Sequence, residues 1–408
     1  MDASRPAHPG NSMATQWLLN IGHAIDHMFL LIFATAVTSI ASDFGIARWE
    51  DLMPYSVGAF FFFGIGSLPS GRLGDHWGRR KMMVVFFFGM GAAALLVSAT
   101  QSPLQMALAL ALLGCFASIY HPVGIPMLVQ SAVRPGLTIG INGLVGNLGV
   151  AVAAVTTGFL VKYVGWRMAF AVPGVLCLVF GCAFAILATR EQAAPAKKKA
   201  GAAVSAPGVS MARLLLVMTV AATSGSLLFN FSTNSNYELL TDKLRSILGD
   251  PARIGALLAG VYAAASLAQV IVGHLIDRMP LKRLYLGIVG AQAILLALAT
   301  VTDGWVFYGL QFLFMAAIFG AIPFTDAMIV RFVDDSMRSR VSGMRLAVSL
   351  GASSIAVWMI GPVVKQAGFA TLLGVMTATA VLSLLVLTQL PATPAPRRAD
   401  ASPVPKPA

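Results

Sequence analysis

The stretch that decides the fold is residues 71–81, which read Gly-Arg-Leu-Gly-Asp-His-Trp-Gly-Arg-Arg-Lys and separate two long apolar runs. Its glycines allow two helix ends to approach closely and the chain to turn sharply. Asp75 places a carboxylate at the end of the preceding helix, and Arg79, Arg80 and Lys81 form a basic cluster. Because basic residues between apolar runs favour the cytoplasmic side of a membrane, the stretch is predicted to form a cytoplasmic hairpin.

The composition places the chain in a membrane. Hydrophobic residues make up 57% of it and charged residues 11%, with a mean hydropathy of +0.80, whereas charged residues make up about a quarter of ordinary soluble domains. The formal net charge of +12 comes from Lys and Arg that lie in loops between apolar runs. This distribution indicates a lipid bilayer as the partner, and it offers no basic face to a nucleic acid.

Twelve apolar runs are predicted to cross the membrane, which takes roughly 20 residues each. Because backbone polar groups in lipid must be satisfied within the segment, each run is expected to be a helix, with kinks at internal prolines that neighbouring helices cover. The runs are residues 16–42, 52–74, 82–100, 103–128, 137–162, 167–189, 212–236, 253–276, 281–300, 304–330, 340–364 and 368–390. The kink positions are Pro69, Pro122, Pro126, Pro173, Pro323 and Pro362.

The orientation follows from the basic residues in the loops. With the N-terminus inside, sixteen Lys and Arg fall in cytoplasmic loops and seven fall on the opposite side. This excess predicts a multi-pass protein of an inner or plasma membrane, with both termini in the cytoplasm.

The chain repeats itself after about half its length. The matching positions are Asp75 and Asp277, Pro122 and Pro323, Gly149 and Gly351, and Gly165 and Gly368, at offsets of 201 to 203 residues. One offset through most of the chain indicates two parallel six-helix repeats with a site between them near the midplane. The predicted organisation is a disordered N-terminus at 1–15, a first half at 16–189, a cytoplasmic linker at 190–212, a second half at 213–390 and a disordered tail at 391–408.

These residues carry a family resemblance. Residues 71–80 resemble the signature loop of the major facilitator superfamily, and His23-Ala24-Ile25-Asp26, Tyr120-His121-Pro122 and Gly146-Asn147-Leu148-Gly149 resemble its fosmidomycin-resistance branch of drug exporters. The resemblance implies an all-α membrane protein with twelve transmembrane helices in two pseudo-symmetric halves, which transports by alternating access. It also implies a cytoplasmic gate at Gly71, Asp75, Gly78, Arg79 and Arg80. The second-half copy retains Asp277 and Arg278 but continues Met279-Pro280, so that side of the gate is expected to be weaker.

A polar stripe runs along the first predicted helix. Asn20, His23, Asp26 and His27 share one face by their spacing. An ionisable residue at membrane depth costs about 2.5–3.5 kcal/mol even on a lenient insertion scale, so it should face a cavity or a partner. Burial favours the neutral form of Asp26, whereas a charged imidazole beside it favours the ionised form. The carboxyl group could therefore bind and release a proton near neutral pH. The alternative is a structural pair in which Asp26 and one histidine satisfy each other.

His121 lies in the fourth predicted helix directly before Pro122. The resemblance places this helix and the first at a central cavity, where His121 could join the stripe in a proton relay or contact substrate. It could equally donate to a carbonyl that the proline leaves free. A metal site formed by His23, Asp26, His27 and His121 is chemically feasible, but no spacing requires one.

Further polar residues are predicted to line the cavity. In the fifth helix Gly140, Gly143, Gly146 and Gly149 form a packing stripe that could serve as a sliding surface between the halves, with Asn142 and Asn147 beside it. The seventh helix supplies Asn230 and Asn234 in an unusually polar run. Asp326 and Arg345 flank the loop between the tenth and eleventh helices and could form an ion pair that gates the second half or is merely structural.

The predicted function is secondary transport. The chain has no phosphate-binding GxxxxGK[ST] motif and no soluble segment that could house a catalytic domain, so ATP-driven transport and enzyme activity are not expected. We expect proton-coupled export of a small toxic compound by a monomer without a cofactor, with Asp26, His23 and His27 coupling protons. The alternatives are proton-coupled uptake of a metabolite, transport of a metal complex, and a sensor that has lost transport.

Overall fold

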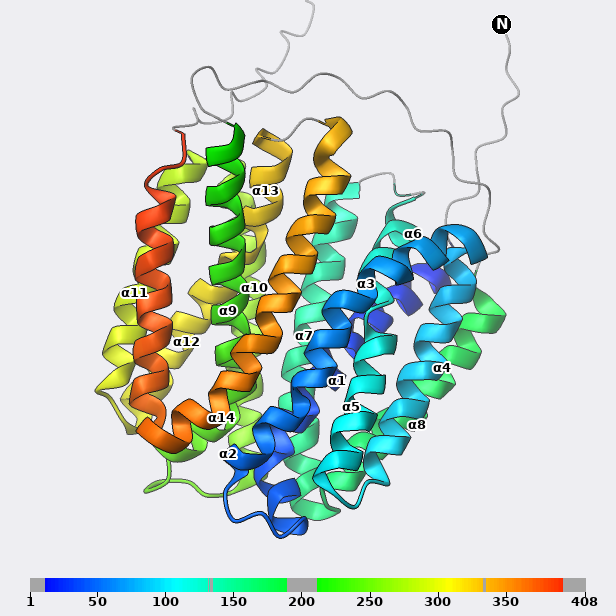
Figure 1. Ribbon diagram of the computed structural model, residues 1–408, viewed down its shortest axis with the longest axis vertical. Coiled ribbons are helices and arrows are strands. Elements are labelled where there is room, and N and C mark those ends of the chain that lie inside the picture. The colour runs from blue at the N-terminus through cyan, green and yellow to red at the C-terminus, as the bar shows by residue number, and fades with distance from the viewer. Residues whose placement is uncertain (1–11, 131, 133–134, 189–210, 333–334, 392–408) are drawn as a thin grey trace, which may run out of the picture.

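The computed structural model describes residues 12–130, 132, 135–188, 211–332 and 335–391, and Figure 1 draws them as two helical bundles side by side. The first bundle consists of α1 (Met13–Asp43), α2 (Trp49–Leu52), the short helix η1 (Met53–Ser56), α3 (Val57–Trp77), α4 (Arg79–Ser98), α5 (Pro103–Ala117), the π-helical turn η2 (Tyr120–Gly124), α6 (Ile125–Val129), α7 (Pro135–Tyr163) and α8 (Trp166–Leu187). The second consists of α9 (Met211–Lys243), α10 (Pro251–Ile276), α11 (Leu281–Thr300), α12 (Gly304–Gly320), α13 (Ile322–Phe332) and α14 (Asp335–Leu387).

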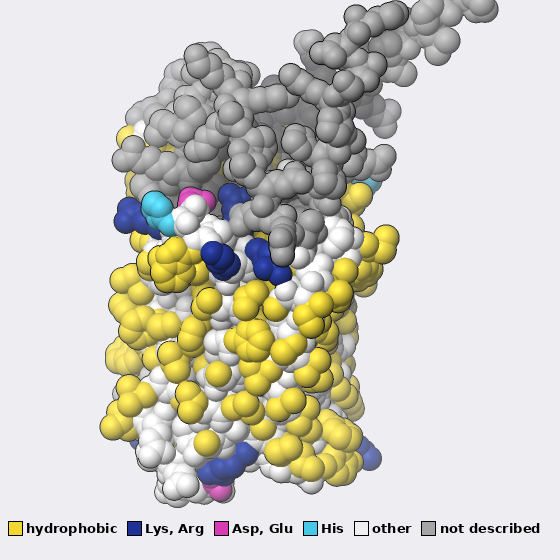
Figure 2. All heavy atoms as spheres, turned by 90° about the vertical axis from the view of Figure 1, so that its right-hand side faces the viewer, with side chains coloured by type: hydrophobic (Ala, Val, Ile, Leu, Met, Phe, Trp, Pro, Cys, Tyr) yellow, Lys and Arg dark blue, Asp and Glu magenta, His cyan; other side chains and the backbone are white. Residues whose placement is uncertain are grey.

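The membrane spans agree with the prediction. Within the described ranges, eleven helical stretches are long and apolar enough to cross a membrane. The last of them contains two spans, because Gly368 has a non-helical backbone with φ 75° that divides α14. Apolar side chains cover the middle of the face in Figure 2, and charged side chains lie towards its two ends. The prediction of an all-α, twelve-helix membrane fold is therefore confirmed.

The repeat has a physical counterpart in the backbone. Gly165 and Gly368, which match in sequence, have φ of 91° and 75°, a conformation that favours glycine. The fourth span is interrupted at Pro122 by η2, and the tenth is interrupted at the start of α13, where Pro323 lies. Because proline removes a backbone donor, both helices break where the sequence predicts a kink.

The bundle has two ends that differ in how the halves meet. We call the end where α8 finishes and α9 begins the linker end, at the top of Figure 1, and the opposite end the distal end. Between the halves, α7 packs along α10 and α3 packs against α14. The helices α7 and α10 approach closely at Gly158, where an added Cβ would lie 2.7 Å from the Pro251 carbonyl oxygen and 3.1 Å from Gly255 Cα.

Polar contacts between the halves gather at the distal end. Lys162 of α7 forms an ion pair with Asp250, and Lys365 of α14 forms one with Asp51. The Thr38 hydroxyl of α1 donates a 2.7 Å hydrogen bond to Glu238 Oε1 of α9. We call these three contacts, which are all formed in this structure, the distal seal.

Candidate functional site

The structure brings the first-helix stripe together with His121. His23, Asp26 and His27 lie on α1, and His121 lies on η2, where the break in the fourth span places it beside them. The ring centroid of His23 is 4.7 Å from that of His27 and 5.1 Å from that of His121. The centroids of His27 and His121 are 5.8 Å apart. The grouping predicted from helical spacing and the proline kink is therefore present.

Asp26 is the buried acid of this cluster. Its side chain has no exposed surface, and His121 Nε2 lies 3.6 Å from its Oδ2 atom. Neither carboxylate oxygen accepts a hydrogen bond from the described residues. An ionised carboxylate in this position would lose its hydration without replacement, unless a neighbouring imidazole carries a positive charge. The cluster is thus arranged to hold a proton on Asp26 or to share charge with His121.

A hydrogen-bond network fixes one wall of the cluster. Asn142 of α7 donates through Nδ2 to Asn20 Oδ1 at 2.9 Å and to the Tyr120 hydroxyl at 2.8 Å. Tyr120 in turn donates to the Leu19 carbonyl at 2.8 Å. His23 Nδ1 lies 2.8 Å from the Asn142 carbonyl oxygen. Because a carbonyl only accepts, Nδ1 carries the hydrogen, and the other ring nitrogen, Nε2, is buried without a hydrogen-bond partner among the described residues.

Tyr120 is a member of the site that the sequence analysis did not assign. Its ring stacks on His23 with centroids 4.7 Å apart and planes 13° from parallel. It is fully buried, and its hydroxyl joins α1 to α7 through the network above. Its position next to His121 was the only available signal, since a tyrosine in a membrane helix is usually part of the packed core.

The glycine stripe of α7 packs against α1 at its two later positions. An added Cβ on Gly146 would lie 2.5 Å from His23 Nδ1, and one on Gly149 would lie 2.1 Å from the Ala24 carbonyl oxygen. Gly140 and Gly143 have no described atom within 4 Å of such a Cβ. The later part of the stripe is therefore a packing face inside the first half, and α7 approaches α10 of the second half at Gly158 instead.

The other predicted cavity residues do not join this cluster. Asn147 donates to Gln269 Oε1 of α10 at 2.8 Å, which links the two halves. Asn230 donates to Ser353 Oγ at 2.8 Å, and Asn234 donates to the Asn230 carbonyl at 3.1 Å. Asn230 and Asn234 thus belong to a network within the second half.

The first-half gate residues form a compact hairpin. Gly78 joins α3 to α4 with φ 95°, and the Asp75 carboxylate lies 3.8 Å from the Arg79 guanidinium. Arg80 donates to the Ala188 carbonyl at 3.2 Å at the end of α8. An added Cβ on Gly71 would lie 3.3 Å from Pro122 Cβ, so the helix also packs closely on η2.

The second-half gate residues are less constrained. Asp277 and Arg278 are exposed at the end of α10. Asp326 and Arg345 lie on α13 and α14, but their side chains are outside the described part of the structure. The predicted ion pair between them stays a prediction.

Glu238 of α9 is a buried acid that the sequence analysis passed over. It is 7% exposed and accepts the hydrogen bond from Thr38 in the distal seal. It lines a cavity of about 670 Å³ between the halves, together with Thr35, Asp43 and Arg167. The signal was present, since Glu238 lies one helical turn after Asn234 in the polar run of the seventh predicted helix.

Three imidazoles are the side chains here that could hold a metal. The ligand nitrogens of His23, His27 and His121 all lie within 4.8 Å of one another. Zinc binds histidine nitrogen at about 2.0–2.1 Å, so the rings would have to approach a common centre to bind it. The donor set suits a borderline metal, and the present spacing is looser than a formed zinc site requires.

Comparison with known proteins agrees with this architecture. The model of the Major Facilitator Superfamily matches residues 19–244 and again 223–408, once for each half. A solved structure described as a bacterial homologue of the human lysosomal transporter Spinster, in an inward-facing and occupied conformation, superposes with a TM-score of 0.73. The two share 12% sequence identity and align over 95% of this chain and 97% of the other, a likeness that concerns the fold.

Several curated relatives are resistance proteins. The multidrug resistance protein MdtG of Escherichia fergusonii is 26% identical over 291 residues, which cover 69% of this chain and 70% of that protein. The puromycin resistance protein pur8 of Streptomyces alboniger is 31% identical over 152 residues, 36% of this chain and 30% of that protein. A protein named "Probable actinorhodin transporter" of Streptomyces coelicolor is 28% identical over 181 residues and is likewise matched over 30% of its length.

The family match covers nearly the whole chain and coincides with the twelve-helix fold, its two-fold repeat and the signature hairpin. The chain belongs to the Major Facilitator Superfamily and is a multi-pass membrane transporter, not an enzyme.

Proposed function

We propose that this transporter exports a small toxic compound or drug in exchange for protons, by alternating access between its two halves. The observation that carries the proposal is Asp26, a fully buried carboxyl group that lies 3.6 Å from its charge partner, the imidazole of His121. Ionisable groups inside membrane spans are costly and are retained mainly for function. The resistance relatives support export, and they support the drug-exporter branch in general more than its fosmidomycin-resistance members.

In this mechanism Asp26 is the proton carrier. His121 is its charge partner, and the hydrogen bond from His23 Nδ1 to the Asn142 carbonyl holds this face of α1 against α7, the fifth span. Proton binding removes the charge on the carboxyl group, whereas bound substrate favours the ionised form of that group. The two ligands thereby compete, which is the requirement for exchange.

We also propose the orientation of the cycle. The linker end, which carries the basic hairpin, faces the cytoplasm, and the distal end faces outwards. Transport then alternates between a state with the distal seal closed, as described above, and a state with the linker end closed by the hairpin. The residues assigned to that closure are Gly71, Asp75, Gly78, Arg79, Arg80, Asp277, Arg278, Asp326 and Arg345.

The test uses the purified full chain in liposomes that contain a pH-sensitive dye. A panel should include an aminonucleoside, an aromatic polyketide and a phosphonate, each applied as a gradient without a pre-set pH difference. We expect at least one compound to move and to drive a proton flux of opposite direction. Movement of a compound without any dye response would refute proton exchange, and an inert panel would favour the non-transporting sensor.

A second candidate is transport of a metal complex, which the grouping of His23, His27 and His121 within 4.8 Å favours. Calorimetry with zinc chloride distinguishes it from drug export. Binding that a His27→Ala substitution weakens by about tenfold or more would favour the metal complex. Equal, weak binding to both proteins would favour a role for the histidines in proton coupling.

A further inference from the structure

Glu238 is a buried carboxyl group within the distal seal. It is the buried acid on the second-half side of the interface, and its Oε1 atom accepts the 2.7 Å hydrogen bond from Thr38 of the first half. The carboxyl group lines the 670 Å³ cavity on one side and a neighbouring cavity of about 400 Å³ on the other. When the halves separate at this end, this hydrogen bond must break and the carboxyl group must become hydrated.

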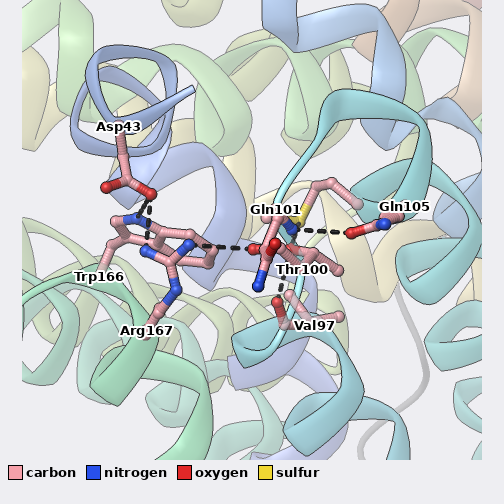
Figure 3. Close-up of polar contacts among 8 residues, drawn as sticks. Asp43, Val97, Thr100, Gln101, Gln105, Trp166 and Arg167 are labelled. Carbon is pink, nitrogen blue, oxygen red and sulfur yellow. Dashed lines mark hydrogen bonds and ion pairs between the residues drawn. The ribbon is translucent and has the colours of Figure 1, made fainter. Parts of the chain in front are cut away.

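The charged groups around Glu238 form ion pairs and hydrogen bonds with residues other than Glu238. Asp43 of α1 accepts from Arg167 at 2.6 Å and from the Trp166 indole at 3.3 Å, and Arg167 also donates to the Thr100 carbonyl (Figure 3). Glu50 of α2 pairs with Arg48 at 2.7 Å. The remaining nearby pairs are Arg245 with Asp242, Lys243 with Asp303, Lys162 with Asp250 and Lys365 with Asp51. Among the described residues, no cationic side chain forms an ion pair with Glu238.

The desolvation of Glu238 therefore differs between the two states of the seal. In the closed state an ionised carboxylate is buried with one neutral hydroxyl donor and no cation, which is unfavourable compared with water. In the open state the same group is hydrated and its charge is tolerated. Closure and protonation of Glu238 are consequently linked, since each makes the other more favourable.

We propose that Glu238 is a second proton-binding site, on the distal side, whose protonation closes the distal seal. The inference rests on the proposed exchange of drug for protons, because it supplies the step that returns the emptied transporter. A proton taken from the outside after drug release neutralises Glu238, and the halves close. Because Glu238 meets water at the distal side, its proton comes from and returns to that side and adds no transported charge.

The neighbouring ion pairs do not explain such a pH response. The ammonium group of Lys162 beside Asp250 holds the pKa of that carboxyl below its usual range. A group whose pKa is depressed in the closed state favours closure above its ordinary pKa and loses this effect as the pH falls through the depressed value. Its contribution therefore weakens in acid, whereas protonation of Glu238 strengthens closure in acid.

The experiment measures the opening of the distal end directly and needs no substrate. Spin labels are placed at Gln101→Cys and Val301→Cys, on opposite halves and outside the seal, in a full chain whose three cysteines are replaced. Distances between the labels are measured by pulsed electron resonance from about pH 5.5 to about pH 8.5. In the parent we expect the ratio of open to closed populations to rise on the order of tenfold across this range.

Glu238→Gln should remove this response and remain closed, because the amide is neutral at every pH. Glu50→Gln is the control for a second buried acid at the same cavity, one that is already paired with Arg48. It should retain the response in a weaker form, because the Glu50 charge repels an ionised Glu238. Thr38→Val should retain and steepen it, because the ionised carboxylate loses more from the missing donor than the neutral acid does. Thr38→Val also serves as the second test should Glu238→Gln fail to fold.

A titration in Glu238→Gln equal to that of the parent, or none in the parent, would overturn the inference. Its failure is separable from failure of the proposed function. Drug-driven proton flux in liposomes with a pH-independent seal would reject Glu238 alone. A pH-dependent seal in a protein that moves no compound would reject export alone.

Discussion

Replacing Asp26 with Asn is expected to abolish drug-driven proton movement while the protein remains folded. Asn has nearly the shape of Asp but cannot lose a proton, so its side chain mimics the protonated carboxyl group at every pH. The buried Asp26 oxygens have no hydrogen-bond donors among the described residues, so removing the charge should not destabilise the bundle. In the liposome assay the dye response should fall to background, and uphill export should be lost. Exchange of labelled for unlabelled drug at equal concentrations needs no proton, so it should persist but require a higher drug concentration, because the amide mimics the protonated state with which drug binding competes.

The control for Asp26 is the other acid of the same helix. Asp43→Asn removes an acid that is 41% exposed and paired with Arg167, so proton coupling should survive it. His121→Gln should keep transport but shift its pH dependence, because His121 is the charge partner of Asp26. A normal dye response in Asp26→Asn would show that Asp26 is not the proton carrier and that another group couples protons.

The helical spacing of the sequence was sufficient to predict the face that carries the site. His23, Asp26 and His27 share a face because of their spacing, and the repeat at Pro122 and Pro323 located the breaks in the fourth and tenth spans. These predictions depend on local geometry, which the chain specifies residue by residue. The twelve-helix fold follows for the same reason, since a span is defined by its own length and hydropathy.

The contacts between helices could not be predicted from the sequence. Whether Asn142 meets Tyr120 or faces substrate depends on the rotation of α7 against α1, and helical periodicity does not fix that rotation. The hydrogen bond of Glu238 could not be predicted because its partner, Thr38, lies 200 residues away in the sequence. Likewise, a regular stripe of glycines does not indicate which members another helix touches.

The glycine stripe gives a prediction of large and opposite effects within one helix. Gly149→Ala should destabilise the protein by about 1–3 kcal/mol, the usual cost of overpacking. The added Cβ would lie 2.1 Å from the Ala24 carbonyl oxygen, a backbone atom that cannot rotate away, so α1 and α7 would have to separate. Gly143→Ala meets no described atom within 4 Å and should be neutral or stabilise by up to about 1 kcal/mol through helix propensity.

Thermal unfolding of both variants in the same detergent measures the contrast. We expect a lower midpoint for Gly149→Ala than for the parent, and an equal or higher midpoint for Gly143→Ala. Equal midpoints for the two variants would mean that α1 and α7 do not meet at Gly149. Such a result would also contradict the described packing of His23 against α7. Gly146 contacts His23, and Gly149 lies one helical turn later on the same face. The position of the Asp26 helix, α1, against α7 therefore depends on a contact that a single methyl group can test.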